Sequence, residues 1–333
     1  MAKALNLRKL AAFEKWDVVT VNTIETMSQE NPILEDILWL QENTPNGYKH
    51  RERAVLPTVI ARKYNQGIET SVNGVKTVID PRTELLSKLE LDNSYLEDFD
   101  DAAEALADEQ EAYRTANGQK LGAALFYGTR GKESLYGFAP RYNTLNPAIS
   151  TSKYIIDASV GISSPSNLAS IWMIAWGKRT VHGFYPRKSK AGLIEEPLQD
   201  NPNVAGENGG TLPGKTQYFK WKAGLAVEDF RSVVRIANID TVKAATLNVG
   251  ASNVPDLEAL LIKAFRLIKA KGATIVCYAN QDVMSALDLQ ALGRYKQSYP
   301  IKEFAGGLLT FVKGNIPVRQ QDCLLSTEEL VTA

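Results

Sequence analysis

The stretch Val55–Asp80, VLPTVIARKYNQGIETSVNGVKTVID, decides how the rest of the chain is interpreted. It is rich in β-branched residues and is interrupted at Asn65-Gln66-Gly67 and again at Asn73-Gly74. Asn-Gly accepts the two positive φ angles of a type I′ turn, which joins the two strands of a hairpin. A two-stranded ribbon is only marginally stable alone. We therefore expect a long hairpin that another part of the protein supports, with charges on both of its sides at Arg62, Lys63, Glu69 and Lys76.

The segment 94–117 after this ribbon has the features of a long helix. It contains no proline, Ser94 and Glu97 form a capping box, and acidic residues fill the first turns, where the helix dipole favours negative charge. Asn117-Gly118 is a typical helix end. A narrow apolar stripe on so acidic a helix predicts that much of it faces water or a partner; the stripe comprises Leu96, Phe99, Ala103, Leu106 and Tyr113.

The segments before the ribbon and after the helix differ in composition and in the spacing of their apolar residues. Residues before the ribbon predict an extended arm with one or two short helices. Ser170–Trp176 is a continuous apolar run, and Phe219–Val227 alternates apolar and polar residues with the period of a strand, which "SVVRIANI" continues. The residues from about 185 to 217 between them are dense in Gly, Pro and Asn, and predict a long loop.

After Asp240 the pattern alternates between helix and strand. We expect a helix that Asn253 caps and that stops at Gly272, then a buried strand at "TIVCYA", and then a second helix that Asn280 caps and that runs to about Leu292. "GLLTFVKGNIPVRQ", residues 307–320, predicts a pair of strands near the C-terminus.

Composition excludes several classes of protein. The 333 residues are 44% hydrophobic and carry 38 Lys and Arg against 38 Asp and Glu. This balance argues against a protein that coats nucleic acid with a surface of Lys and Arg. Two cysteines without a C-x-x-C spacing support neither a disulfide framework nor a cysteine zinc site. We find no signal peptide and no run of about 18 apolar residues, so we expect no membrane span. A reducing compartment is the simplest expectation.

"GGTLPGKT", residues 209–216, fits the phosphate-binding template G-x-x-x-x-G-K-[ST]. A working loop of this kind needs a buried strand before it and a helix that starts at the lysine. The preceding "DNPNVAGEN" is no buried strand, Pro213 removes one backbone N–H, and a period-two strand follows Lys215. We therefore expect a glycine-rich surface loop, with an ATP- or metal-dependent enzyme as the rival hypothesis.

The other candidates for chemistry are weak. The chain has two histidines, His50 and His182, and neither has an evident nucleophile and carboxylate to complete a triad. The acidic run 98–108 spreads around its helix without a loop to focus it on a metal. Short basic clusters lie at 51–53, 178–179 and 187–190, and are expected to be solvated or to form salt bridges. We predict no catalytic residue, no metal site and no cofactor. A loose arm, a charged ribbon and an acidic helix instead indicate a protein that assembles.

Four long stretches resemble a known family. They are "LFYGTRGKESLYGFAPRYNTLN" (125–146), "SIWMIAWGKRTVHGFYPRKSKAGLIEEPLQD" (170–200), "FKWKAGLAVEDFRSVVRIANID" (219–240) and "GNIPVRQQDCLLSTEELV" (314–331). Together they resemble major capsid proteins of tailed bacteriophages, especially short-tailed phages of the Bordetella and Salmonella type. The resemblance implies the α+β Hong Kong 97-like capsid fold, shared with herpesvirus shells.

The resemblance also implies a division of the chain. Its parts would be an N-terminal arm (1–46), an extended loop with a β-hairpin (47–92), a peripheral domain (93–240) with the spine helix 94–117, an axial domain (241–305), and C-terminal strands that return to the peripheral domain (306–333). The usual order of this fold places the axial helix, strand and helix before the long peripheral strand. Here Phe219–Ile239 comes first, which predicts a permuted strand order.

By resemblance, many copies would assemble as hexamers and pentamers into an icosahedral head around double-stranded DNA, without catalysis or sequence-specific DNA binding. A decoration or cement protein, a scaffold and a portal are expected partners, and the host bacterial cytoplasm is the expected place of assembly. We predict charge pairing between ribbon and neighbouring spine; the alternative is that both are solvated. The residues are Arg51, Arg53, Arg62 and Lys63 on the ribbon, and Asp98, Asp101 and Glu104 on the spine. An encapsulin-like cellular compartment shell is the rival assembly.

Overall fold

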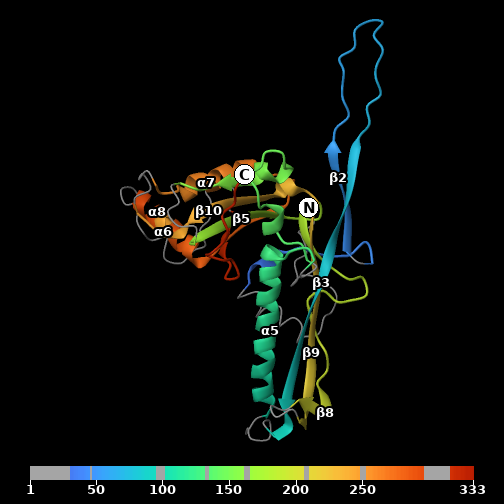
Figure 1. Ribbon diagram of the computed structural model, residues 1–333, viewed down its shortest axis with the longest axis vertical. Helices are drawn as coiled ribbons and strands as arrows, with labels where there is room; N and C mark the ends of the chain where they lie inside the picture. Colours follow the sequence, from blue (N-terminus) through green and yellow to red (C-terminus); the bar gives the residue numbers. More distant parts are fainter. Residues whose placement is uncertain are drawn as a thin grey trace.

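A computed structural model gives the architecture, and it describes residues 31–45, 47–94, 102–131, 135–160, 166–205, 210–247, 253–295 and 316–333. Figure 1 shows a body of strands and helices with two long extensions that run in opposite directions. One extension is the hairpin of strands β2 (Gly47–Val55) and β3 (Gly74–Asp92). The other is a stalk in which helix α5 (Ala102–Tyr127) lies beside β3 and β9 (Thr211–Val227). Among the described residues, no helix is long and apolar enough to cross a membrane.

One mixed sheet runs through the body and both extensions. Its main path has the order β12-β11-β5-β6-β9-β3-β2. The strands of this path not yet given are β5 (Leu168–Trp176), β6 (Val181–Tyr185), β11 (Thr274–Ala279) and β12 (Val318–Gln320). Five further strands pair beside it: β1 (Trp39–Gln41), β4 (Ile155–Asp157), β7 (Leu193–Glu195), β8 (Gln199–Ala205) and β10 (Val233–Asp240). The strands predicted at 170–176, 219–227 and 232–239 are thus confirmed, as β5, β9 and β10.

Strand β5 is the wall between two hydrophobic cores. All of its residues are buried, as the continuous apolar run predicts. Trp172 and Trp176 pack into the core that also holds Phe126 and Phe138. Met173 and its neighbours on the other face pack into a second core, which the helices of the body cover. Because successive side chains of a strand point to opposite faces, a strand between two cores is mainly apolar; its one hydroxyl, on Ser170, accepts from Arg235 Nε at 3.0 Å.

Strand β9 alternates as predicted. Its apolar face is buried in the first core and consists of Phe219, Trp221, Ala223, Leu225 and Val227. On the other face, Lys220 pairs with Glu196 and Lys222 pairs with Glu84. The period of two therefore sets which face of β9 packs on α5: Tyr113 of the helix stacks on Phe219 with 5.5 Å between ring centroids.

Helix α5 does not end at Asn117-Gly118, as the sequence predicts, but continues to Tyr127. Asn117 is buried, and its amide donates both to Ser87 Oγ and to the Tyr113 carbonyl one turn earlier, each at 2.7 Å. The added turns are held by tertiary packing of Leu121, Leu125 and Phe126. Burial of these side chains outweighs the local stop signal. Residues 95–101 lie outside the described part of the chain. They include most of the first turns predicted for this helix, and Leu96 and Phe99 of the predicted stripe.

The predicted hairpin exists, but its turn is not at Asn73-Gly74. Gly74 pairs with Val55 as the first residue of β3, and neither Asn73 nor Gly74 has a positive φ. Residues 56–73 form no strand, and the tight turn lies near Asn65, whose φ is 63°. The reason is that β3 continues into the stalk, where it pairs with β9, and this long-range pairing fixes which residues face β2.

The region after Asp240 follows the predicted helix–strand–helix pattern: α6 (Thr241–Ala244), α7 (Leu257–Leu267), β11 and α8 (Gln281–Tyr295). Asn280 caps α8, as predicted, through a 3.0 Å hydrogen bond from the Val283 N–H. The cap of α7 is Asp256 and not Asn253, because its carboxylate accepts the Ala259 N–H at 3.0 Å.

Two other predictions need correction or restriction. The loop predicted for 185–217 contains β7, β8 and the start of β9, because both short strands pair with β9. In the predicted C-terminal strand pair, β12 is present, and residues 307–315 lie outside the described part. Of the predicted N-terminal arm, residues 31–45 are described and include the short helix α3 (Ile33–Asp36) and β1.

Candidate functional site

The hairpin presents apolar side chains that its own chain leaves uncovered. Tyr64 is fully exposed and Val59 is 92% exposed. Because a large exposed apolar surface on one element marks an interaction site, we take the hairpin as the candidate functional surface. Figure 1 shows that the loop of this hairpin projects away from the body. Its exposed large apolar residues are Leu56, Val59, Ile60, Tyr64, Ile68, Val72, Val75 and Ile79.

The basic residues predicted for contact lie on this hairpin. Arg51 is exposed on β2, Arg62 and Lys63 are exposed near its tip, and Arg53 lies on β2 with its side chain outside the described set. Within the described residues none of Arg51, Arg62 and Lys63 forms an ion pair.

The predicted contact with acidic residues of the spine is not tested by the described part of the chain. Asp98 and Asp101 lie outside the described residues, and Glu104 lies on α5 with its side chain outside them. In Figure 1 the hairpin tip and the first turns of α5 are at opposite ends of the molecule.

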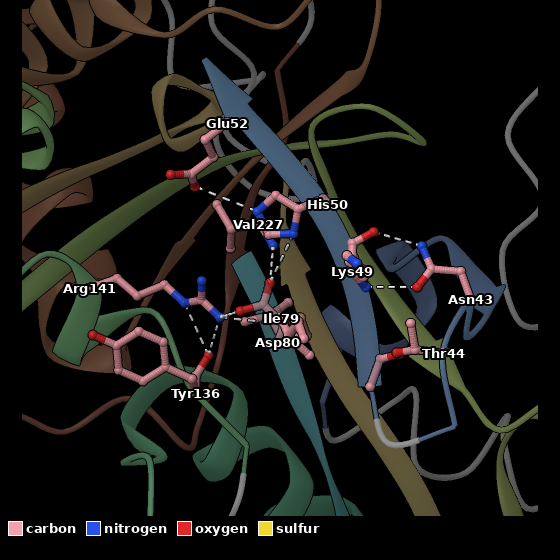
Figure 2. A network of polar contacts seen from close by, with 12 residues as sticks. Asn43, Thr44, Lys49, His50, Glu52, Ile79, Asp80, Tyr136, Arg141 and Val227 are labelled. Atoms are coloured by element: carbon pink, nitrogen blue, oxygen red, sulfur yellow. Dashed lines mark hydrogen bonds and ion pairs between the residues drawn. The ribbon is translucent and has the colours of Figure 1, made fainter. Parts of the chain in front are cut away.

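The base of the hairpin is a buried polar network (Figure 2). Asp80 of β3 is 1% exposed; its carboxylate accepts from Arg141 Nη2 at 2.8 Å and from the Val227 N–H at 3.3 Å. Arg141 also donates to the Tyr136 carbonyl and lies over the Tyr136 ring at 4.4 Å. These contacts fasten the hairpin to the end of β9 and to the segment that follows α5.

A second ion pair lies two residues further along β3. Arg82 donates to both carboxylate oxygens of Glu42, at 2.8 and 3.1 Å. Both bonds come from the one nitrogen Nη1, and they are charge-assisted, which makes them stronger than bonds between neutral groups. Between the two anchors, Pro81 lies opposite Gly47 and has no N–H to donate. Ion pairs thus hold the chain on both sides of Pro81, which donates no hydrogen bond to the ladder.

Both histidines lie at this base and are buried. His50 lies between Asp80 and Glu52, while the His182 ring packs edge-on against Tyr48 with 4.5 Å between centroids. Neither ring nitrogen of His182 has a hydrogen-bond partner within the described residues. Burial, with a smaller effect of His50, lowers the pKa of His182 to about 3, so it is neutral at ordinary pH. His182 is therefore a packing residue, in line with the structural role predicted for it.

The segment that matched the phosphate-binding template is part of a strand. Residues 211–216 belong to β9, and Lys215 pairs with Leu91 of β3. No helix starts at the lysine, so the geometry that the template needs is absent from the described residues 210–216. The surface-loop prediction was wrong, because residues 211–216 are part of a strand. In the described part of the chain, no group of three or more His, Cys, Asp or Glu side chains could hold a metal ion.

Sequence reasoning missed the buried charges that join distant segments. Arg235 pairs with Glu328 at 2.9 Å, and Arg114 of α5 donates to both oxygens of Glu195 at 2.7 and 3.0 Å. A usable signal existed for Arg235, since a lone arginine inside the apolar run "SVVRIANI" needs a buried partner. No comparable signal identified Asp80 as a buried anchor.

Comparisons with known proteins agree with this architecture. A family model for the major capsid protein GP7 matches residues 17–332. The solved structure of bacteriophage Epsilon15 is similar, with a TM-score of 0.72 and 25% identity, covering 90% of each chain. The capsid of bacteriophage JBD30 aligns with a TM-score of 0.46 and 9% identity, over 89% of this chain and 90% of that chain. A search of curated protein sequences finds no match.

The fold is mixed α and β, with an extended hairpin, a long helix beside it and a helix-covered body, which confirms the predicted Hong Kong 97-like class. The protein is therefore a structural subunit of a tailed-phage capsid shell, and the chain belongs to the major capsid protein GP7 family.

Proposed function

We propose that many copies of this chain close into hexamers and pentamers of an icosahedral head around double-stranded DNA. The observation that carries the proposal is the hairpin, whose apolar residues, Tyr64 and Val59 above all, are exposed in the single chain. Burying such side chains against a second copy contributes about 25 cal/mol per Å² of apolar area. Repetition over many contacts yields a stable shell from individually modest interfaces.

We further propose that the hairpin lies across a neighbouring copy and that its bases face the acidic start of that copy's α5. The bases are Arg51, Arg53, Arg62 and Lys63, and the acids are Asp98, Asp101 and Glu104. The hairpin tip and the first turns of α5 lie at opposite ends of the molecule, which supports a contact in trans. Exposed pairs contribute about 0–1 kcal/mol each, so they would set direction and register more than strength.

The division of the chain remains part of this proposal. We assign residues 1–46 to an arm, 47–92 to the extended loop, 93–240 to a peripheral domain, 241–305 to an axial domain and 306–333 to returning strands. The two hydrophobic cores on either side of β5 support two packed regions, although β5 itself belongs to both.

The proposal includes partners and a place of assembly. A balanced charge of 38 basic and 38 acidic residues suits a wall that encloses DNA without sequence-specific binding. A scaffold, a portal and a decoration or cement protein are the expected protein partners, with assembly in the host bacterial cytoplasm. The subunit acts without catalysis, cofactor or metal.

Electron microscopy of the purified full-length chain, with sedimentation as a check on mass, tests the proposal. The expected species are closed shells or rings of five and six subunits. The triple variant Arg51→Glu, Arg62→Glu, Lys63→Glu should reduce their yield, whereas Lys263→Glu, an exposed charge on α7, should not. A uniform monomer under all conditions, including with the phage's own scaffold, would overturn it.

A further inference from the structure

The hairpin is joined to the rest of the protein through a short junction around Pro81. Upstream of this residue β3 pairs with β2, and from Arg82 onward it pairs with β9. The Asp80–Arg141 and Arg82–Glu42 pairs hold the two sides. A proline at this point leaves the ladder one donor short, so rotation of the hairpin about the junction breaks few backbone hydrogen bonds.

His50 closes this junction from the hairpin side (Figure 2). Its side chain is 3% exposed, with Nδ1 at 3.7 Å from Asp80 Oδ2 and Nε2 at 3.5 Å from Glu52 Oε1. Neither nitrogen makes a hydrogen bond within the described residues. A buried polar ring without partners is costly, and a small closing movement would give it two.

The charge of the ring decides whether both contacts can form. A protonated imidazole has two N–H donors and faces two carboxylates, whereas the neutral ring has one donor and one acceptor. Neutral His50 would thus set a lone pair against one of the carboxylates. Interaction with His50 also lowers the pKa of Glu52, as a complementary pair requires.

The other charged and titratable groups around this point come from every neighbouring element. Arg141 stays on Asp80, and Lys76 of β3 acts on Glu52. His182 of β6 remains neutral because burial lowers its pKa to about 3. Tyr48 stays protonated, since burial, with Glu228 as the next cause, raises its pKa to about 12. His50 is the group at this point whose two ring nitrogens face two carboxylates, so its charge decides which contacts form.

We propose that His50 is a proton-operated lock on the hairpin: the protonated ring bridges Asp80 and Glu52 and holds the hairpin in place, and the neutral ring releases it to pivot at Pro81. The lock is a property of the single subunit; its consequence for shell geometry rests on the proposed contact between hairpin and neighbour.

Hydrogen–deuterium exchange of the full-length chain tests the lock. Sedimentation is used to check that all variants are compared in the same oligomeric state. The readout is the protection factor of peptides that contain the Val227 amide, which donates to Asp80 across the junction; each rate is corrected for the intrinsic rate at its own pH. We expect protection to fall between pH 5.5 and pH 8, the interval in which an imidazole ordinarily changes charge. Lys49→Gln, an exposed charge on the same strand, should behave like the natural protein.

His50→Gln should give protection that does not change with pH in this range. If that variant fails to fold, Glu52→Gln serves instead and should reduce the pH dependence, because one of the two carboxylates is gone. A pH-independent natural protein, or a His50→Gln variant that keeps the full pH dependence, would overturn the lock. Neither result depends on whether shells form, so failure of the proposed assembly would be seen separately by microscopy.

Discussion

The Arg235 guanidinium lies 2.9 Å from the Glu328 carboxylate, and the two side chains are only 5% and 4% exposed. This pair ties β10 to the C-terminal segment, and the Tyr127 hydroxyl also donates to Glu328, at 2.6 Å. A few residues on, the Asn238 side chain exchanges two hydrogen bonds with the Val331 backbone. The end of the chain is thus built into the core of the body.

Replacement of Arg235 by Met should destabilise the protein by about 3–5 kcal/mol, because it leaves a buried carboxylate without its countercharge. Urea unfolding followed by tryptophan fluorescence measures the change. The double variant Arg235→Met, Glu328→Leu should recover most of the loss, since an apolar pair of similar volume leaves no buried charge unpaired. A single variant as stable as the natural protein would contradict this role.

Gly47→Ala should destabilise the base of the hairpin by more than about 1 kcal/mol. Gly47 has a φ of 152°, and a Cβ there would lie 2.2 Å from the Asp80 carbonyl oxygen. Gly67→Ala is the matched control, because a Cβ at that position meets nothing within 4 Å. Exchange protection of residues 47–55 and the free energy of unfolding separate the two variants. Equal effects would show that the Gly47 contact is not restrictive.

Asp36 should make the protein less stable as pH rises from about 4 to above 6. Burial raises its pKa from an ordinary value of 3.8 to about 6, in spite of the 2.7 Å hydrogen bond from Tyr278. A group whose pKa is raised on folding favours the folded state when it is protonated, and that contribution is lost as pH rises through the folded pKa. Unfolding free energies measured from pH 4 to pH 7 should show this fall.

Asp36→Asn should remove this pH dependence and raise the stability at pH 7 by about 1–3 kcal/mol, since the amide carries no charge to desolvate. Asp322→Asn, at an exposed site on the neighbouring C-terminal segment, is the control and should leave the pH dependence intact. An unchanged pH profile in Asp36→Asn would assign the effect to another group.

Val59→Ser combined with Tyr64→Ser should leave the free energy of unfolding of the subunit within about 0.5 kcal/mol, because both side chains are exposed. The yield of closed shells should fall, since the apolar area available to a neighbour is smaller. Light scattering at equal protein concentration measures assembly. Loss of subunit stability without loss of assembly would place the function of these side chains inside the subunit.

Local patterns predicted the elements whose burial follows directly from the spacing of their own apolar residues. The alternation in Phe219–Val227 gave the buried face of β9, and the continuous run in Ser170–Trp176 gave a strand buried on both faces. The Asn280 cap was also right, because a cap depends on a few adjacent residues.

Predictions failed where distant segments decide the outcome. Asn73-Gly74 is a good turn sequence, but pairing of β3 with β9 takes Gly74 into a strand. Asn117 is a good helix end, but its bond to Ser87 and the packing of Leu125 carry α5 further. The sequence predicted the hairpin but not the buried Asp80 at its base. The residues adjacent to Asp80 in the sequence do not indicate that its carboxylate is buried.

The continuity of β3 through hairpin and stalk determines how the subunit responds to force. Strand β3 pairs with β9 in register from Arg82–Gly224 to Asp92–Gly214. Ladder hydrogen bonds lie perpendicular to the strands, so a pull on the hairpin along β3 loads them in shear and all together. A force perpendicular to β3 would break the hydrogen bonds of this ladder one at a time. The ladder between β3 and β9 therefore resists a pull along the strands more strongly than a pull across them.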